Sequence, residues 1–273
     1  MPELPEVETT CRGLRPCVIG RSVGRVLIRE ARLRWPVPQD LPELLLGRVV
    51  QSLERRGKYL LLGFAHGSVL IHLGMSGSLR LMPPDEPLKK HDHIDVCLVS
   101  DDPRVLRYHD PRRFGAMLWT SDLPQQHPLL ADLGPEPLGG EFGGDYLYDL
   151  ARRRGVALKT FIMDSRVVVG VGNIYASEAL FRARLHPERA VSAIGRDSWL
   201  ALADAIKAVL MHAIQQGGTT LRDFVNGHGQ PGYFQQALDV YGREGLPCKV
   251  CANPVRCIRL GQRSTYFCGH CQR

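Results

Sequence analysis

Four cysteines near the C-terminus constrain the fold of this chain more than any other feature. They are spaced C-x2-C-x16-C-x2-C and comprise Cys248, Cys251, Cys268 and Cys271. Two such C-x2-C knuckles bind one tetrahedral zinc ion, and four protein thiolates leave no open coordination position. The chain does not start with the basic and then apolar segments of a secretion signal, so metal ligands in a reducing compartment are favoured over disulfides. The sequence therefore predicts a C-terminal zinc ribbon with one structural Zn2+.

The segment between the two cysteine pairs is basic and alternates like a β-hairpin. Gly261 lies at the expected tip, and between positions 243 and 273 the only acidic residue is Glu244. The basic residues of this stretch are Arg243, Lys249, Arg256, Arg259, Arg263 and Arg273. A basic hairpin held by metal suits a nucleic-acid groove, with a protein-interaction ribbon as the alternative. The remaining cysteines, interpreted as buried small residues, are Cys11, Cys17, Cys97 and Cys257.

Short β-rich runs recur between about residues 20 and 120, separated by turns that contain glycine. The predicted strands are 22–29, 48–53, 58–64, 68–73, 78–82, 94–99, 104–108 and 114–119. Strands at this spacing indicate a sandwich or barrel, and apolar spacing over residues 5–17 predicts a helix before them. The helix-breaking stretch 134–140 marks the expected domain boundary. Helices over 173–184 and 197–216 and a loop over 217–234 are predicted after it.

The charge of the chain favours a polyanionic partner. Its 273 residues include 35 Lys and Arg and 28 Asp and Glu, which gives a formal net charge of +7. Nucleic acid is the first candidate for a protein with such an excess of basic residues. No apolar run is long enough to cross a membrane, so the sequence predicts no membrane partner.

The first residues of the chain contain a candidate nucleophile. If the initiator methionine is removed, Pro2 carries a free secondary amine, and an α-amino group titrates near ~7.7–8.0, so a useful fraction is unprotonated at neutral pH. Glu3 is a candidate proton donor beside it. Pro5 and Glu6 also suit the first turn of an ordinary helix, which is the alternative interpretation of the same residues.

Two further stretches of the β-rich region are candidates for contact with nucleic acid. Lys58 follows Gly57 at the start of an apolar strand, where a lysine is either functional or simply solvated. The turn 110–115 holds two arginines and Phe114, which either insert into a duplex or, for the aromatic ring, pack in the core. The run 89–93 contains two histidines and an aspartate, which indicates either a metal site or a basic edge that contacts phosphate.

Asn173 follows Gly170-Val171-Gly172 at the start of a predicted helix. Backbone N–H groups at such a helix start bind phosphate, but the third glycine of a dinucleotide fingerprint is missing. Asn173 is therefore also a candidate for a plain N-cap.

Taken in order along the whole chain, these motifs resemble the formamidopyrimidine-DNA glycosylase family, bacterial enzymes that excise oxidised purines. The matching stretches are 2–9 (PELPEVET), 57–60 (GKYL), 72–77 (HLGMSG), 110–115 (DPRRFG), 170–175 (GVGNIY), 217–220 (GGTT) and the zinc module with Gln262 and Arg263. The sister branch, endonuclease VIII, usually carries glycine where this chain has Leu4. Leu4 therefore favours the purine-directed branch.

The resemblance implies an α+β protein: an N-terminal β-sandwich with a leading helix, a helical helix–two-turn–helix domain, and a C-terminal zinc ribbon. The expected bounds of these three parts are 1–133, 134–240 and 241–273. It also implies a monomer that acts on damaged double-stranded DNA in the bacterial cytoplasm, associated with the nucleoid. The reaction implied is base removal followed by β- and δ-elimination at the resulting abasic site.

The same resemblance assigns roles to individual residues. The implied catalytic residues are Pro2 as nucleophile, Glu3 in sugar ring opening, Glu6 as a supporting acid, Lys58 near the lesion phosphate and Arg263 in δ-elimination. The implied DNA-backbone contacts are His91, Arg112, Arg154 and Asn173. The residues implied to fill the gap left by the extruded base are Met75, Arg112 and Phe114. Two alternatives stay open: an oxidised-pyrimidine glycosylase of the endonuclease VIII type, and a non-catalytic zinc-ribbon DNA-binding protein.

Overall fold

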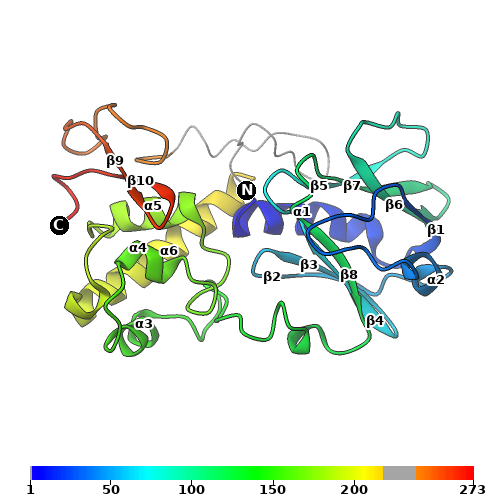
Figure 1. The fold of residues 1–273 in the computed structure, drawn as a ribbon, viewed down its shortest axis with the longest axis horizontal. Helices are drawn as coiled ribbons and strands as arrows, with labels where there is room; N and C mark the ends of the chain where they lie inside the picture. Colours follow the sequence, from blue (N-terminus) through cyan, green and yellow to red (C-terminus); the bar gives the residue numbers. More distant parts are fainter. Residues whose placement is uncertain (1, 218–237) are drawn as a thin grey trace. The chain divides into compact units, whose positions relative to one another are not determined.

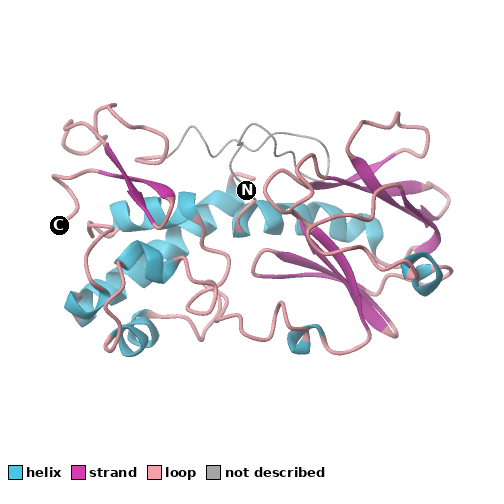
Figure 2. Ribbon diagram, in the orientation of Figure 1, coloured by secondary structure: helices cyan, strands magenta, loops and turns pink. Residues whose placement is uncertain are grey.

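The computed structural model describes residues 2–217 and 238–273. Within them the chain forms two compact units, and the backbone passes from the first to the second between Ala131 and Asp132. Strands dominate the first unit and helices the second (Figures 1 and 2). Gly217 is the one residue of the predicted 217–234 loop that the structure describes, and residues 218–220 of the GGTT motif lie outside the described residues.

The first unit contains two four-stranded antiparallel sheets. Its elements are α1 (Leu4–Val18), β1 (Ser22–Ile28), α2 (Leu41–Leu45), β2 (Ser52–Arg56), β3 (Tyr59–Phe64), β4 (Gly67–His72), β5 (Ser78–Met82), β6 (Asp92–Val99), β7 (Arg104–His109), β8 (Ala116–Thr120) and a 3-10 turn (Pro124–Gln126). The strand orders are β1-β6-β7-β5 and β2-β3-β4-β8. Buried side chains from both sheets belong to one apolar core, so the predicted β-sandwich is confirmed.

Helix α1 packs along this core because its apolar residues recur at helical spacing. Val7, Cys11, Leu14 and Val18 are at most 1% exposed and join the core of the sandwich. Complete burial of a side chain such as Leu14 contributes about 1.5–3 kcal/mol relative to its exposure to water. The packing therefore fixes the helix, and with it the start of the chain, against the sandwich.

The predicted strand over residues 48–53 is wrong in its position. The observed β2 begins at Ser52, because the backbone of residues 48–50 bonds to the segment after α1 and to the start of β1. Val50 O accepts a hydrogen bond from Gly20 N at 2.8 Å, and Val23 N donates to Arg48 O at 2.8 Å.

The second unit is helical and ends in a β-hairpin. Its elements are α3 (Gly144–Ala151), α4 (Leu158–Ile162), α5 (Asn173–Arg182), a 3-10 turn (Val191–Ala193), α6 (Arg196–Gln215), β9 (Arg256–Leu260) and β10 (Arg263–Phe267). The apolar stripe of α6 is buried, with Trp199, Leu202 and Ile206 at most 1% exposed, so the predicted core role of this helix is confirmed. Among the described residues, none of the helices has both the length and the apolar character needed to cross a membrane.

Candidate active site and nucleic-acid interface

The start of helix α1 holds the candidate nucleophile and its two acidic neighbours. Glu3 is the N-cap residue, and its N–H donates a hydrogen bond to Oε2 of Glu6 at 2.8 Å, as in a capping box. Glu3 and Glu6 are each 2% exposed, and Pro2 is buried. The residues that cap the helix are thus also the residues of the candidate site. Through its capping bond, Glu6 fixes the orientation of the peptide that follows Pro2.

Lys58 lies in the two-residue turn between β2 and β3, directly after Gly57, whose φ is +57°. The register of β3 and β4 places Tyr59 opposite His72, and their ring centroids are 4.8 Å apart. Burial, together with the positive charges of Lys58 and Arg34, lowers the pKa of His72 to about 4. A neutral imidazole therefore lies beside the candidate catalytic lysine at neutral pH.

The neutral His72 ring has a defined hydrogen-bonding pattern. Its Nδ1 accepts a hydrogen bond from Gly74 N at 3.1 Å, so the ring proton is assigned to Nε2. From the sequence, His72 was identified only as the first residue of the HLGMSG motif, and no role was predicted for its side chain. Its position at the end of an apolar strand, two residues before a glycine, is the signal that would have marked it.

Asp110 organises the turn 110–115. Its carboxylate is fully buried and accepts hydrogen bonds from Ser76 Oγ at 3.2 Å, Arg112 N at 3.3 Å and Gly115 N at 2.9 Å. A Cβ on Gly115 would lie 1.8 Å from the hydroxyl of Tyr108, so only glycine fits there. The turn is therefore held in one conformation by a buried acid and a close backbone approach.

This conformation presents two apolar side chains to solvent. Phe114 is 44% exposed and Met75 is 42% exposed, and the guanidinium of Arg112 lies 4.7 Å from the Phe114 ring centroid. The interpretation that Phe114 packs in the core is therefore wrong. Exposed apolar residues backed by a rigid turn are what an intercalating wedge requires.

His91 precedes β6 in a group of histidines. Its ring centroid lies 6.2 Å from that of His93 and 6.0 Å from that of His109. His109 Nδ1 contacts Asp92 Oδ1 at 2.8 Å, and His93 Nε2 contacts the backbone oxygen of Asp110 at 2.7 Å. These ring nitrogens are engaged by protein groups, and the one metal-ligand cluster among the described residues is elsewhere. The metal interpretation of 89–93 is therefore not supported.

In the second unit, Asn173 connects helix α5 to the terminal hairpin. Its Nδ2 donates to Ser264 O at 3.0 Å, and its Oδ1 accepts from Nζ of Lys159 at 2.7 Å. Gly172, not Asn173, is the N-cap of α5, so the N-cap interpretation of Asn173 is wrong. The side chain instead joins the helix start to β10.

Lys159 is a functional candidate that the sequence analysis missed. It is 1% exposed, and besides Asn173 its Nζ donates to Thr265 Oγ1 at 2.9 Å and Ser264 O at 3.3 Å. A lysine is seldom fully buried unless it is paired, because removing its charge from water is costly. Its place in the apolar helix α4, between Leu158 and Phe161, was the available signal.

Arg154 and Arg263 line one pocket of about 370 Å³ in the second unit. Gly261 and Gln262, both with positive φ, form the turn of the hairpin, and Arg263 follows as an exposed residue at the start of β10. The guanidinium of Arg154 lies 5.4 Å from the Phe161 ring centroid on the pocket wall. Two exposed arginines thus border the same concavity.

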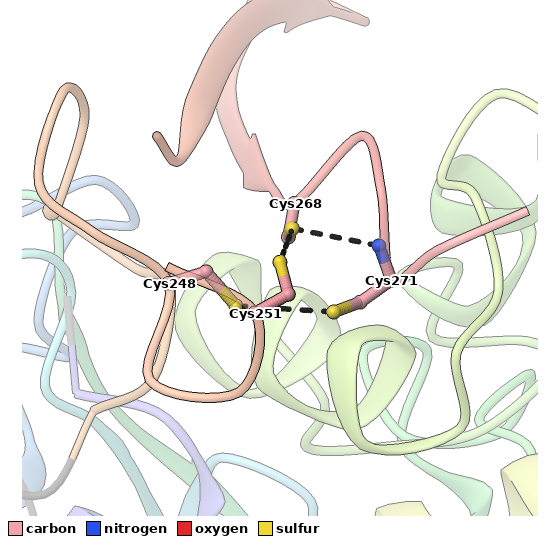
Figure 3. Close-up of side chains that lie close together, drawn as sticks. All are labelled: Cys248, Cys251, Cys268 and Cys271. Carbon is pink, nitrogen blue, oxygen red and sulfur yellow. Dashed lines mark hydrogen bonds between the residues drawn. The ribbon is translucent and has the colours of Figure 1, made fainter. Parts of the chain in front are cut away.

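The four predicted cysteine ligands converge at the base of the hairpin (Figure 3). Their sulfur atoms all lie within 4.8 Å of one another, with Cys251 and Cys268 3.5 Å apart and Cys248 and Cys271 3.9 Å apart. A tetrahedral ion with Zn–S bonds of about 2.3 Å places its sulfurs roughly 3.8 Å apart. The thiols therefore fit one structural zinc ion, as predicted, and Cys257 on β9 is outside the cluster. Of the four cysteines predicted to be buried small residues, Cys11 is buried, whereas Cys17, Cys97 and Cys257 are partly exposed, so the prediction is wrong for these three.

Comparison with known proteins gives a consistent family relationship along the chain. Three family models match in order: the formamidopyrimidine-DNA glycosylase N-terminal domain at residues 1–117, its H2TH domain at 133–225, and the zinc finger found in FPG and IleRS at 245–273. The formamidopyrimidine-DNA glycosylase of Methylococcus capsulatus is 59% identical over the full length of both chains. The match to the H2TH model agrees with the predicted helix–two-turn–helix domain.

Solved structures of this type share the fold of the chain. The MutM (Fpg) protein from Thermus thermophilus is 38% identical, with 99% of this chain and 98% of that chain covered and a TM-score of 0.88. The wild-type Lactococcus lactis Fpg (MutM), in complex with DNA that contains N7-benzyl-Fapy-dG, is 32% identical over all of both chains, with a TM-score of 0.91.

Proposed function

The chain belongs to the formamidopyrimidine-DNA glycosylase family, and from this we propose that it is a bifunctional DNA glycosylase and abasic-site lyase of base excision repair. Its substrates are oxidised purines, 8-oxoguanine and formamidopyrimidines, in duplex DNA. The observation that carries this proposal is the N-terminus: a proline at position 2, followed by two buried carboxylates at the start of a helix fixed to the core.

In the proposed reaction, the Pro2 nitrogen attacks C1′ of the extruded nucleotide. The bond between C1′ and the base breaks, and the base leaves with the bonding electrons and takes up a proton. Glu3 donates a proton to the ring oxygen as the sugar opens, which leaves an iminium between Pro2 and C1′. The iminium acidifies the neighbouring sugar protons. Loss of these protons expels first the 3′ phosphate and then the 5′ phosphate, and water releases Pro2.

The other residues support this chemistry. Glu6 orients the Glu3 peptide through the 2.8 Å hydrogen bond already described. Lys58 and Arg263 bind and neutralise phosphates at the lesion, since backbone phosphate contacts supply most of the affinity for DNA. His91, Arg112, Arg154 and Asn173 are further backbone contacts. Met75 and Phe114 occupy the space of the extruded base, because a base in a stack is inaccessible at C1′.

We further propose a division of labour among three parts of the chain. Residues 1–133 carry the chemistry, 134–240 bind the duplex, and 241–273 present Arg263 from the zinc ribbon. The protein acts as a monomer in the bacterial cytoplasm, associated with the nucleoid.

The test is borohydride trapping on duplexes with a single lesion. Borohydride reduces an iminium to a stable amine, so protein that starts at Pro2 should become linked to DNA that contains 8-oxoguanine opposite cytosine. Peptide mapping should place the cross-link on Pro2. Protein with one residue fused before Pro2 is the control, since its proline nitrogen is an amide without an available lone pair, and it should bind DNA without forming this adduct.

Each alternative gives a different outcome in the same assay. Preference for a thymine glycol duplex over 8-oxoguanine would identify an endonuclease VIII-type enzyme. Binding without any adduct or excision by native protein would identify a non-catalytic DNA-binding protein. A cross-link on Lys58 with Pro2 blocked would move the nucleophile to the lysine.

A further inference from the structure

An open pocket in the first unit is lined mainly by arginines, three of which have been given no role so far. Its volume is about 630 Å³, and it is bordered by the turn 110–115 and by the segment that follows β1. The lining residues are Arg32, Arg34, Arg112, Arg113 and Phe114. Arg112 and Phe114 are the proposed DNA contacts, so this pocket adjoins the proposed wedge.

Glu30 binds two of these arginines through its carboxylate. Arg32 donates from Nε to Oε1 at 2.8 Å and from its terminal nitrogen to Oε2 at 2.6 Å, and the Arg32 backbone N–H donates to Oε1 at 2.9 Å. Arg113 contacts Oε2 at 3.2 Å. One carboxylate therefore links the segment after β1 to the wedge turn.

The charge of Glu30 is secure at physiological pH. The side-chain hydrogen bond from Arg32, together with its backbone N–H and the charge of Arg113, lowers the pKa of Glu30 to about 2. The Glu30 side chain is only 20% exposed, whereas that of Arg32 is 82% exposed. An anion thus lies among arginines whose outer surfaces face solvent.

A guanidinium fork binds carboxylate and phosphate oxygens with the same geometry. The two Glu30 oxygens occupy the donor directions that two phosphate oxygens would take. Ion pairs at exposed arginines are weak because water and salt screen them, so a phosphate can replace the carboxylate. The Glu30 pairs are therefore suited to exchange rather than to permanent structure.

Arg34 extends the basic surface toward the candidate active site. Its guanidinium lies 4.7 Å from the ring centroid of Trp35. Its charge also contributes to the lowered pKa of His72, next to Lys58. The arginine pocket and the Lys58 turn therefore belong to one electropositive region of the first unit.

We propose that Arg32, Arg34 and Arg113 form a second phosphate-binding subsite beside the wedge, and that Glu30 occupies it as an internal competitor until DNA displaces it. This inference deepens the proposed function and rests on it. Competition by Glu30 lowers the affinity for every duplex. The lower affinity has its largest consequence on undamaged DNA, where no extruded base adds contacts that hold the protein. Glu30 thus limits retention on undamaged DNA.

The test is Glu30→Gln, which keeps the shape of the side chain and removes its charge. Binding is measured by fluorescence anisotropy against an undamaged duplex and a duplex with an uncleavable abasic-site analogue, over a series of salt concentrations. Glu30→Gln should bind the undamaged duplex roughly 3- to 10-fold more tightly at low salt. Its salt slope should steepen by about one phosphate contact, because arginines now free to bind phosphate release more counterions.

Asp145→Asn is the matched control. Asp145 pairs with Arg196 at 2.6 Å on an exposed surface of the second unit, so this variant makes the same charge change away from the pocket. The affinity of Asp145→Asn should stay close to that of the native protein. An equal gain in both variants would show a net-charge effect and overturn the proposal.

A double variant assigns the gain to the arginines. Glu30→Gln with Arg32→Gln should lose most of the gain, since the residues act through one contact. Weaker or unchanged binding by Glu30→Gln alone would mean that Glu30 only positions the arginines, and would also overturn the proposal. Excision and trapping by the native protein are measured separately, so failure of the proposed function is distinguishable from failure of the subsite.

Discussion

His72 shows how burial sets the charge of one side chain beside the candidate active site. An isolated histidine titrates near 6.5, but burial and two nearby cations bring the pKa of His72 to about 4. The proton is therefore taken up by the unfolded chain at a higher pH than by the folded protein. Stability from this residue is complete above pH 6.5 and decreases as the pH falls toward 4, by about 3 kcal/mol.

This behaviour predicts the titration of a single ring. In an NMR titration, the His72 ring should stay neutral down to about pH 5, while the half-buried His91 is followed in the same spectra. The dependence of the unfolding free energy on pH between 6.5 and 4 should be shallower for His72→Gln than for the native protein. A midpoint for His72 near 6.5 would contradict the buried, cation-flanked environment described above.

Phe114→Ala should slow base excision from a duplex about 10-fold while changing cleavage at a preformed abasic site much less. The exposed ring helps to hold the space of the extruded base, and such stacking contributes about 1–3 kcal/mol, whereas an abasic site has no base to extrude. Single-turnover rates on the two substrates measure the difference. Leu123→Ala, which truncates another exposed apolar residue, is the control. Equal losses on both substrates would exclude a wedge role.

At the residue scale, the sequence predicted the roles of side chains whose chemistry follows from residue type and local spacing alone. The four cysteines are an example, since their spacing alone defines the zinc site. Lys159, His72 and Asp110 were not assigned, because their roles depend on burial and on partners far along the chain. Lys159 contacts Thr265, 106 positions away, and no local pattern shows such a contact.

At the scale of elements, helix α4 depends on its tertiary contacts. It has five residues, Leu158–Ile162, which is too short to be stable alone, and its buried Lys159 binds the start of α5 and strand β10. Periodicity cannot mark so short a helix, which is why it was not predicted, whereas the 20-residue α6 was. A long amphipathic helix repeats its apolar spacing over several turns and can be predicted from it, whereas a one-turn helix shows no repeat.

Lys159→Met should loosen the hairpin and weaken DNA binding while the helices persist. The change leaves Asn173 Oδ1 and Thr265 Oγ1 without a buried donor, which costs about 1–3 kcal/mol for each unsatisfied group. Hydrogen exchange should become faster in β10, and affinity for a lesion duplex should fall. Lys207→Met, in α6, makes the same charge change and should alter neither the exchange in β10 nor the affinity for the lesion duplex. Unchanged exchange in β10 would mean that Lys159 does not hold the hairpin.

At the scale of the whole molecule, the β-sandwich and the zinc module differ in what keeps them folded. The first has a large apolar core shared by two sheets and α1. The zinc module has only a small cluster, formed by Phe181, Val240, Cys248, Val255 and Cys268. Small domains with so little apolar burial rely on a metal for their stability, so loss of zinc should unfold the zinc module and leave the sandwich folded.

Removal of zinc should abolish tight DNA binding without unfolding the sandwich. The thiolates fix the base of the hairpin, and the hairpin presents Arg263 and receives the hydrogen bonds of Lys159 and Asn173. Chelated protein, or Cys268→Ser, should therefore show fast hydrogen exchange in β9 and β10 but native exchange in α1 and β3. Both should lose affinity for DNA. Added zinc should restore the affinity of the chelated native protein. Cys257→Ser is the control, because this thiol lies on β9 outside the four-cysteine cluster, and it should keep one zinc and native affinity. If metal-free protein binds DNA as tightly as native protein, the zinc ribbon does not take part in recognition. If Cys268→Ser and Cys257→Ser lose zinc equally, the four ligands are wrongly assigned.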